Sequence, residues 1–153
     1  MVAAAPARSE ADYAKYIGGR EYVSVVFGQS YAVMRHAKAA VVNSGTASLE
    51  CALVGTPQVV AYKGAEINFL IAKMIIKIQY ISLGNLILDR ICFRELLQYY
   101  FTPDNVLYEV RRMIEDEEYR SAMLAGYQEI RDALGGEGAS AAVARAMIEE
   151  LKK

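Results

Sequence analysis

Short apolar runs alternate with segments of helical periodicity along the first half of the chain. The runs are rich in β-branched, aromatic and small apolar residues and predict buried strands over residues 2–5, 22–27, 39–42, 58–62 and 80–83. Between them, the pattern predicts helices over residues 9–17, 31–36, 47–54 and 65–77. Two helix ends carry local signals, because Ser9 suits an N-cap and Gly55 suits a left-handed C-cap.

From about Phe93 onward the pattern is helical only. It predicts helices over residues 93–99, 103–116 and 117–134, and Ser140 can cap a last helix that ends at about Leu151. Strands spaced by helices, with continuous apolar runs, indicate a parallel sheet covered on both faces. We therefore expect one α/β domain over residues 1–153: a Rossmann-like parallel sheet of about five strands, helices on both faces and a helical C-terminal tail.

Composition narrows the function classes. The 153 residues include 54% hydrophobic and 23% charged residues, so a folded core is expected. A net charge of −1 argues against generic nucleic-acid binding. Two isolated cysteines, Cys51 and Cys92, fit a reducing compartment, and the single His36 leaves little for a histidine-rich metal site or a catalytic triad.

The longest apolar stretch, Ile67 to Ile81, is interrupted by polar residues and is shorter than the roughly 20 residues that span a bilayer. Two interpretations remain open for it. It is either a buried helix followed by a buried strand, or a surface that lies on a membrane or against a partner.

The turn after the strand at 39–42 is the best candidate for chemistry. In an open α/β sheet, ligands bind beyond the carboxyl ends of the strands. Here Asn43-Ser44-Gly45-Thr46 opens a helix whose free N–H groups and dipole suit a phosphate or diphosphate. Glu50, one turn further, could bind a sugar diol. The structural alternative is that Ser44 or Thr46 only caps the helix and Glu50 is solvated.

Other patterns in the sequence give weaker evidence for a functional site. Residues 136–141 imitate a dinucleotide-binding glycine motif but follow a helix, and the acids at 115–118 fit a solvated face better than a metal site. His36 fits a helix end better than a catalytic role. Neither a phosphate-binding P-loop nor an Asp-x-Asp pattern is present.

Several ordered motifs resemble those of lipid-A-disaccharide synthases. Residues 43–50 (NSGTASLE) resemble the family's S-G-T-A-T-L-E segment, and residues 56–62 (TPQVVAY) resemble its T-P-x-V-V-x-Y strand. Ala72-Lys73 fits the family's W-L-A-K-like helix. Residues 80–87 (YISLGNLI) resemble Y-V-S-L-P-N-L-L, and residues 95–98 (ELLQ) match its E-L-L-Q. The resemblance covers about residues 20–150.

This resemblance implies a membrane-associated, inverting glycosyltransferase with two Rossmann-like halves, the GT-B arrangement, and no metal or other cofactor. Such an enzyme transfers 2,3-diacylglucosamine from UDP to 2,3-diacylglucosamine 1-phosphate, on the cytoplasmic side of the inner membrane of a Gram-negative bacterium. The matched motifs belong to its C-terminal, donor-binding half. By that resemblance Ser44, Gly45 and Thr46 would hold the diphosphate and Glu50 the ribose. Asn85 and Arg90 would line the donor cleft, and Glu95 and Gln98 would support it.

Departures from the family qualify this expectation. Gly84 replaces the usual Pro, Ile91 stands where an acid commonly follows the Arg, and position 94 is Arg94 rather than Pro or Lys. The N-terminal half, with the acceptor site and the expected catalytic base, has no counterpart here. The family's glycine-serine-arginine phosphate loop is missing too, together with its strand. We therefore expect a fragment that is inactive alone.

The missing strand would normally be central, so the fragment must close the gap or pair with another chain. A homodimer that exchanges C-terminal segments is also expected to be accessible. Two other functions remain open. One is another UDP-sugar enzyme of the same architecture, including an epimerase; the other is a non-enzymatic flavodoxin-like interaction domain.

Overall fold

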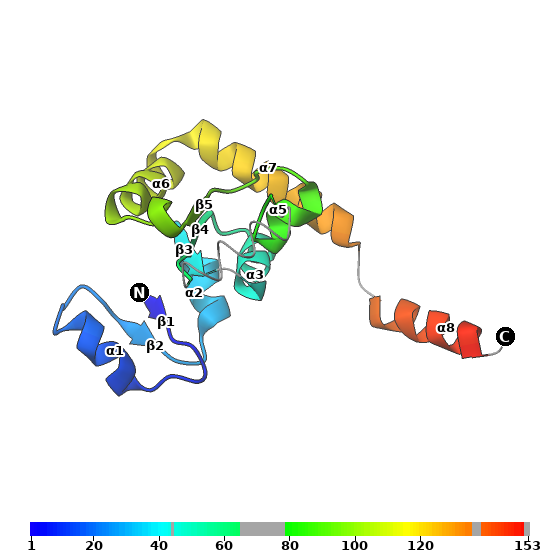
Figure 1. The fold of residues 1–153 in the computed structure, drawn as a ribbon, viewed down its shortest axis with the longest axis horizontal. Helices are drawn as coiled ribbons and strands as arrows, with labels where there is room; N and C mark the ends of the chain where they lie inside the picture. The colour runs from blue at the N-terminus through cyan, green and yellow to red at the C-terminus, as the bar shows by residue number, and fades with distance from the viewer. Residues whose placement is uncertain (44, 65–78, 136–138, 152–153) are drawn as a thin grey trace.

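Five parallel strands form two separate sheets in the computed structural model, which describes residues 1–43, 45–64, 79–135 and 139–151 (Figure 1). The smaller sheet pairs β1 (Val2–Ala3) with β2 (Val25–Val26). The larger has the order β3-β4-β5 and contains β3 (Ala40–Asn43), β4 (Gln58–Tyr62) and β5 (Glu95–Leu97). The expected parallel pairing is confirmed, but no described strand joins the two sheets.

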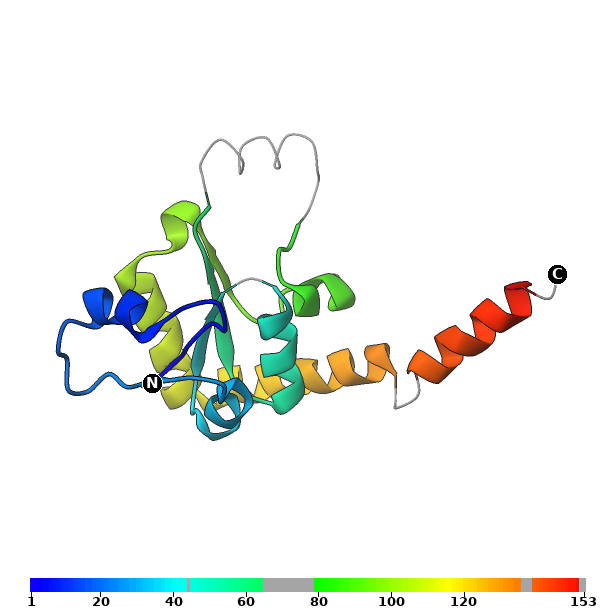
Figure 2. The same cartoon turned by 90° about the horizontal axis from the view of Figure 1, so that it is seen from below.

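Helices cover both faces of the larger sheet (Figure 2). On one side lies α6 (Pro103–Glu115), and on the other lie α3 (Thr46–Val54) and α5 (Leu83–Leu88). The helix α1 (Glu10–Ile17) lies beside the smaller sheet (Figure 1). The helix α7 (Glu117–Leu134) packs against α3, α5 and α6, and α2 (Ser30–His36) packs against α3. The last helix, α8 (Ala139–Leu151), extends away from the body, which confirms the helical tail (Figures 1 and 2).

The core lies between β4, β5 and the helices α6 and α7. Tyr127 of α7 is fully buried, its ring meets Phe93 edge-on at 6.0 Å between centroids, and its hydroxyl donates to the carbonyl of Thr56. The remaining fully buried apolar side chains of this cluster include Ala52, Val59, Val60, Met113 and Ile130. Both faces of β4 are covered, as its uninterrupted apolar pattern predicts.

Elements with strong local signals form where the sequence predicts them. The helix α1 follows Ser9, which forms a capping box with Asp12, and ends at Gly18 in the left-handed region. The helix α3 ends at Gly55, also left-handed, and β4 and α7 have the predicted bounds. The last helix begins at Ala139, so Ser140 lies inside it rather than at its cap. The helix predicted over 65–77 lies outside the described residues.

Two predicted elements were wrong. The strand predicted over 80–83 is a bend that leads into α5, because the Glu95 carboxylate binds the amides of Ile81 and Ser82 at the start of that helix. The helix predicted over 93–99 is instead β5 followed by the 3-10 turn η1 (Gln98–Tyr100). Pairing with β4 decides this, as the amide of Val60 donates to the Arg94 carbonyl at 2.9 Å.

The strand predicted over 22–27 contracts to the two residues of β2. Among the described strands it pairs only with the short β1, and Tyr22 is 82% exposed rather than buried. No helix among the described residues is long and apolar enough to cross a membrane.

Candidate functional site

The carboxyl ends of β3, β4 and β5 meet at one edge of the larger sheet. Asn43 lies opposite Ala61, and Tyr62 lies opposite Leu97. Gly45 and Thr46 follow β3 at this edge, and Gln98 follows β5. Ligands of open parallel sheets bind beyond such an edge, so the structure places the predicted turn where that rule requires it.

The N-terminus of α3 is open on the side of this edge. Gly45 is the N-cap with a φ of +127°, a conformation that side-chain-bearing residues rarely adopt. Thr46 is already inside the helix and exposed, and no described side chain caps the helix. The structural alternative that Thr46 is the N-cap is therefore wrong. Ser44 lies outside the described residues, so its predicted role stays a prediction.

Glu50 lies on α3 one turn after Thr46 and is half-buried. Residues four apart on a helix share a face, so the carboxylate follows the open N-terminus along one side of α3. Among the described residues no ion pair involves Glu50. This arrangement leaves a carboxylate one turn beyond a helix N-terminus that no described side chain caps.

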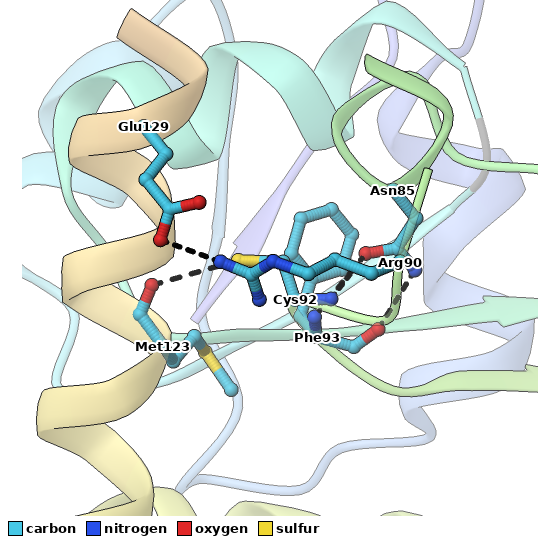
Figure 3. Close-up of polar contacts among 6 residues, drawn as sticks. All are labelled: Asn85, Arg90, Cys92, Phe93, Met123 and Glu129. Atoms are coloured by element: carbon cyan, nitrogen blue, oxygen red, sulfur yellow. Dashed lines mark hydrogen bonds and ion pairs between the residues drawn. The ribbon is translucent and has the colours of Figure 1, made fainter. Parts of the chain in front are cut away.

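Asn85 of α5 is fully buried, and both polar atoms of its side chain form hydrogen bonds within the protein (Figure 3). Its oxygen accepts from the amides of Cys92 and Phe93, at 2.8 and 3.3 Å. Its Nδ2 donates to the Phe93 carbonyl and to Glu95, both at 2.9 Å. These four bonds fill the capacity of the amide, so Asn85 ties α5 to the segment that leads into β5.

Glu95 stabilises the same region from β5. Its carboxylate accepts from the amides of Ile81 and Ser82, from the Ser82 hydroxyl and from Asn85. An anion at the N-terminus of α5 also interacts favourably with the helix dipole. Glu95 thus fixes the start of α5. Ser82, which is fully buried, is not among the residues predicted from the sequence. A serine directly before a helix is the signal that could have found it, because serine favours the N-cap position.

Arg90 forms an exposed ion pair with Glu129 of α7, with 2.6 Å between Nη2 and Oε1 (Figure 3). The hydrogen bond to Glu129 raises the pKa of the Arg90 guanidinium. The structure therefore brings Arg90 to α7. Among the described residues no hydrogen bond or ion pair joins it to Gly45, Thr46 or Glu50.

Gln98 combines two unusual features at the end of β5. Its φ of +49° is uncommon for a residue with a side chain, and it is only 6% exposed. Its Nε2 has no hydrogen-bond partner among the described residues, although buried polar groups are almost always paired. A buried donor without a described partner at the carboxyl edge of the sheet is a candidate contact for a bound molecule.

The cysteines, His36 and the metal-ligating side chains form no further candidate site among the described residues. Burial raises the pKa of both Cys51 and Cys92 to about 11, so neither thiol suits nucleophilic chemistry at neutral pH. His36 ends α2, as predicted. No group of three or more metal-ligating side chains occurs among the described residues.

A family model described as lipid-A-disaccharide synthetase matches residues 15–147, which contain every candidate residue above. The chain belongs to the lipid-A-disaccharide synthase family. It is 34% identical over 146 residues to the lipid-A-disaccharide synthase of Trichlorobacter lovleyi, covering 93% of this chain and 38% of that relative. With that of Anaeromyxobacter dehalogenans it is 33% identical over 150 residues, covering 97% of this chain and 39% of the relative.

The synthase of Acidobacterium capsulatum is 35% identical over 116 residues, which cover 76% of this chain and 29% of the relative. The chain therefore spans less than two fifths of the length of these lipid-A-disaccharide synthases. Membership in this family favours the synthase over an epimerase or a flavodoxin-like interaction domain.

Proposed function

We propose that this chain is the donor-binding part of a lipid-A-disaccharide synthase. The whole enzyme would transfer 2,3-diacylglucosamine from UDP to 2,3-diacylglucosamine 1-phosphate and release UDP. The observation that carries this proposal is the N-terminus of α3, which no described side chain caps and which opens at the carboxyl edge of a parallel sheet with Glu50 one turn beyond. Such an arrangement suits a nucleoside diphosphate: the amides face the phosphates and the carboxylate faces the ribose diol.

The roles at this site follow from chemistry. The diphosphate gains negative charge as the bond to the sugar breaks, and the amides and dipole of α3 would stabilise that charge. Gly45 lets the diphosphate approach the backbone, and Ser44 and Thr46 would donate hydroxyls. The unpaired Nε2 of Gln98 would donate to the donor at the far side of the edge.

In this proposal, two of the predicted residues stabilise the donor cleft without contacting the donor. Asn85 and Glu95 use their polar atoms on each other and on the backbone, so they would hold the start of α5 in place. Arg90 would line the cleft only if it left Glu129. The catalytic base would belong to the N-terminal half of the enzyme, so this chain alone would not catalyse transfer.

The setting of the enzyme is also part of the proposal. Acylated substrates reside in a membrane, so we place the enzyme at the cytoplasmic face of the inner membrane of a Gram-negative bacterium, bound peripherally. A homodimer with exchanged C-terminal segments is supported by α8, which stands apart from the body (Figure 1). Its exposed apolar residues include Val143, Met147, Ile148 and Leu151.

The test is a titration of the isotopically labelled chain with UDP, followed amide by amide. We expect shifts at Gly45, Thr46 and Glu50, and weaker binding of 2′-deoxy-UDP, which lacks one hydroxyl of the diol. The variant Glu50→Gln should bind both nucleotides with similar affinity, whereas the control Glu118→Gln, exposed on α7, should keep the preference. Shifts confined to other regions, or a preference unaffected by Glu50→Gln, would contradict the site.

A further inference from the structure

The helix α3 has almost no charge of its own. Its sequence, TASLECALV, contains one charged residue, Glu50, and its last turn contains no basic side chain. Lysine and arginine are favourable in the last turn of a helix, because the helix dipole leaves partial negative charge on the carbonyls there. A cation that balances this charge on α3 therefore has to come from another element.

Arg131 of α7 is that cation. α7 passes the C-terminal end of α3 (Figure 2), and the Arg131 Nη2 donates to the carbonyls of Ala52 and Leu53, at 3.3 and 3.0 Å. The Arg131 Nη1 donates to the neutral side chain of Gln128. No ion pair among the described residues involves Arg131. Its positive charge is thus directed at the end of α3 and not at a carboxylate.

The other end of α3 is the N-terminus at the carboxyl edge of the sheet, where the donor diphosphate is proposed to bind. The helix has 9 residues. It is therefore only about 13 Å long, at 1.5 Å per residue. Ser48, Cys51 and Ala52 are fully buried along it, so charges at its two ends are screened less than they would be in water. A cation at the C-terminus of α3 therefore attracts an anion at its N-terminus.

We propose that Arg131 is a positioning residue of the donor site: it fixes the C-terminus of α3 and strengthens the attraction of that helix for the donor diphosphate. Arg131 acts through α3 and does not contact the donor. It lies outside all the family motifs found in the sequence, and 79 residues separate it from Ala52. The inference rests on the proposed function, because it requires an anion at the N-terminus of α3.

The experiment titrates the labelled full chain with UDP, UMP and uridine, which share the base and the ribose but differ in charge. Arg131→Gln keeps an N–H donor for the carbonyls and removes the charge. We expect this variant to weaken UDP binding about threefold and UMP binding about twofold, and to leave uridine binding unchanged within about 1.5-fold. Arg131→Lys keeps the charge and should retain most of the affinity for UDP.

Arg120→Gln is the matched control. Arg120 also lies on α7, and its Nη1 donates to the carbonyl of Ile114 in the last turn of α6, at 3.2 Å. The control therefore removes the same charge from the C-terminal end of a helix whose N-terminus is not part of the proposed donor site. It should leave the affinities for all three ligands unchanged within about 1.5-fold.

The possible outcomes separate this inference from the function on which it rests. If the wild-type chain binds no UDP, the proposed function fails and the inference fails with it. If UDP binds but Arg131→Gln and Arg120→Gln lose the same affinity, the inference alone is overturned. Equal weakening of UDP and uridine by Arg131→Gln would also overturn it, because a loosened α3 would weaken every ligand that Glu50 holds. Loss of UDP affinity in Arg131→Lys as large as in Arg131→Gln would exclude the role of the charge.

Discussion

Gly126 shows how a single residue determines the packing of α7. A Cβ built on this glycine would collide with the Cys92 sulfur, and no substitution fits there without movement. The Cys92 thiol also donates weakly to the Met123 carbonyl on the same helix (Figure 3). The close approach of α7 to the segment after α5 therefore depends on the absence of a side chain at 126.

Gly126→Ala should destabilise the protein by about 1–3 kcal/mol, because overpacking outweighs the gain of about 1 kcal/mol in helix propensity. The same change made together with Cys92→Ala should lose most of that penalty, since the collision is removed. Chemical denaturation of the four proteins of this double-mutant cycle measures the coupling. Additive effects of the two substitutions would disprove the collision.

At the scale of elements, the start of α5 depends on a residue of β5. Glu95 takes the place of a local N-cap: its two oxygens serve the backbone at Ile81 and Ser82, together with Ser82 and Asn85 side chains. This crosslink spans at least ten residues of sequence, and it explains why two neighbouring elements are mispredicted together.

Glu95→Gln should lower the free energy of unfolding by about 2 kcal/mol, because one acceptor oxygen becomes a donor that faces N–H groups. Glu129→Gln is the matched control: it removes the exposed ion pair with Arg90 and should cost no more than about 0.5 kcal/mol. Urea denaturation compares them. Equal losses for the two variants would show that Glu95 does not anchor α5.

These contacts also define what the sequence can predict. The caps of α1 and the glycine after α3 act within a few residues, so their elements and the Gly45 turn were predicted correctly. The strand β5 was mistaken for a helix because its pairing with β4, more than thirty residues earlier, outweighs local preference. For the same reason the bonds of Asn85 could not be foreseen, whereas its place near the cleft stays a prediction from family motifs.

At the scale of the whole molecule, α7 holds the larger sheet and its helices together through Tyr127. Burial raises the pKa of the Tyr127 hydroxyl well above its ordinary value, and the hydroxyl donates to Thr56 at 3.1 Å. The unfolded chain releases this proton near pH 10 while the folded protein retains it. Folding stability should therefore be complete below about pH 10 and fall as the pH rises further.

In an alkaline titration monitored by the absorbance of tyrosinate, part of the absorbance increase should appear only at the pH at which the protein unfolds. In Tyr127→Phe, which keeps the ring, that delayed part should shrink and the fall in stability above pH 10 should be less steep. Tyr31→Phe, exposed on α2, is the control and should reduce only the signal that appears before unfolding. Ionisation of every tyrosine in the intact fold would contradict the assignment.

The shielding of the two thiols has a practical consequence. With a pKa of about 11, Cys51 and Cys92 each carry only about one thiolate in ten thousand molecules at pH 7. Alkylating dyes and spin labels react through the thiolate, so the unmodified protein offers them almost no background. A single cysteine introduced on the surface, for instance along α8, can therefore be labelled selectively without removing the native pair, and the protein is suited to fluorescence and distance measurements as it stands.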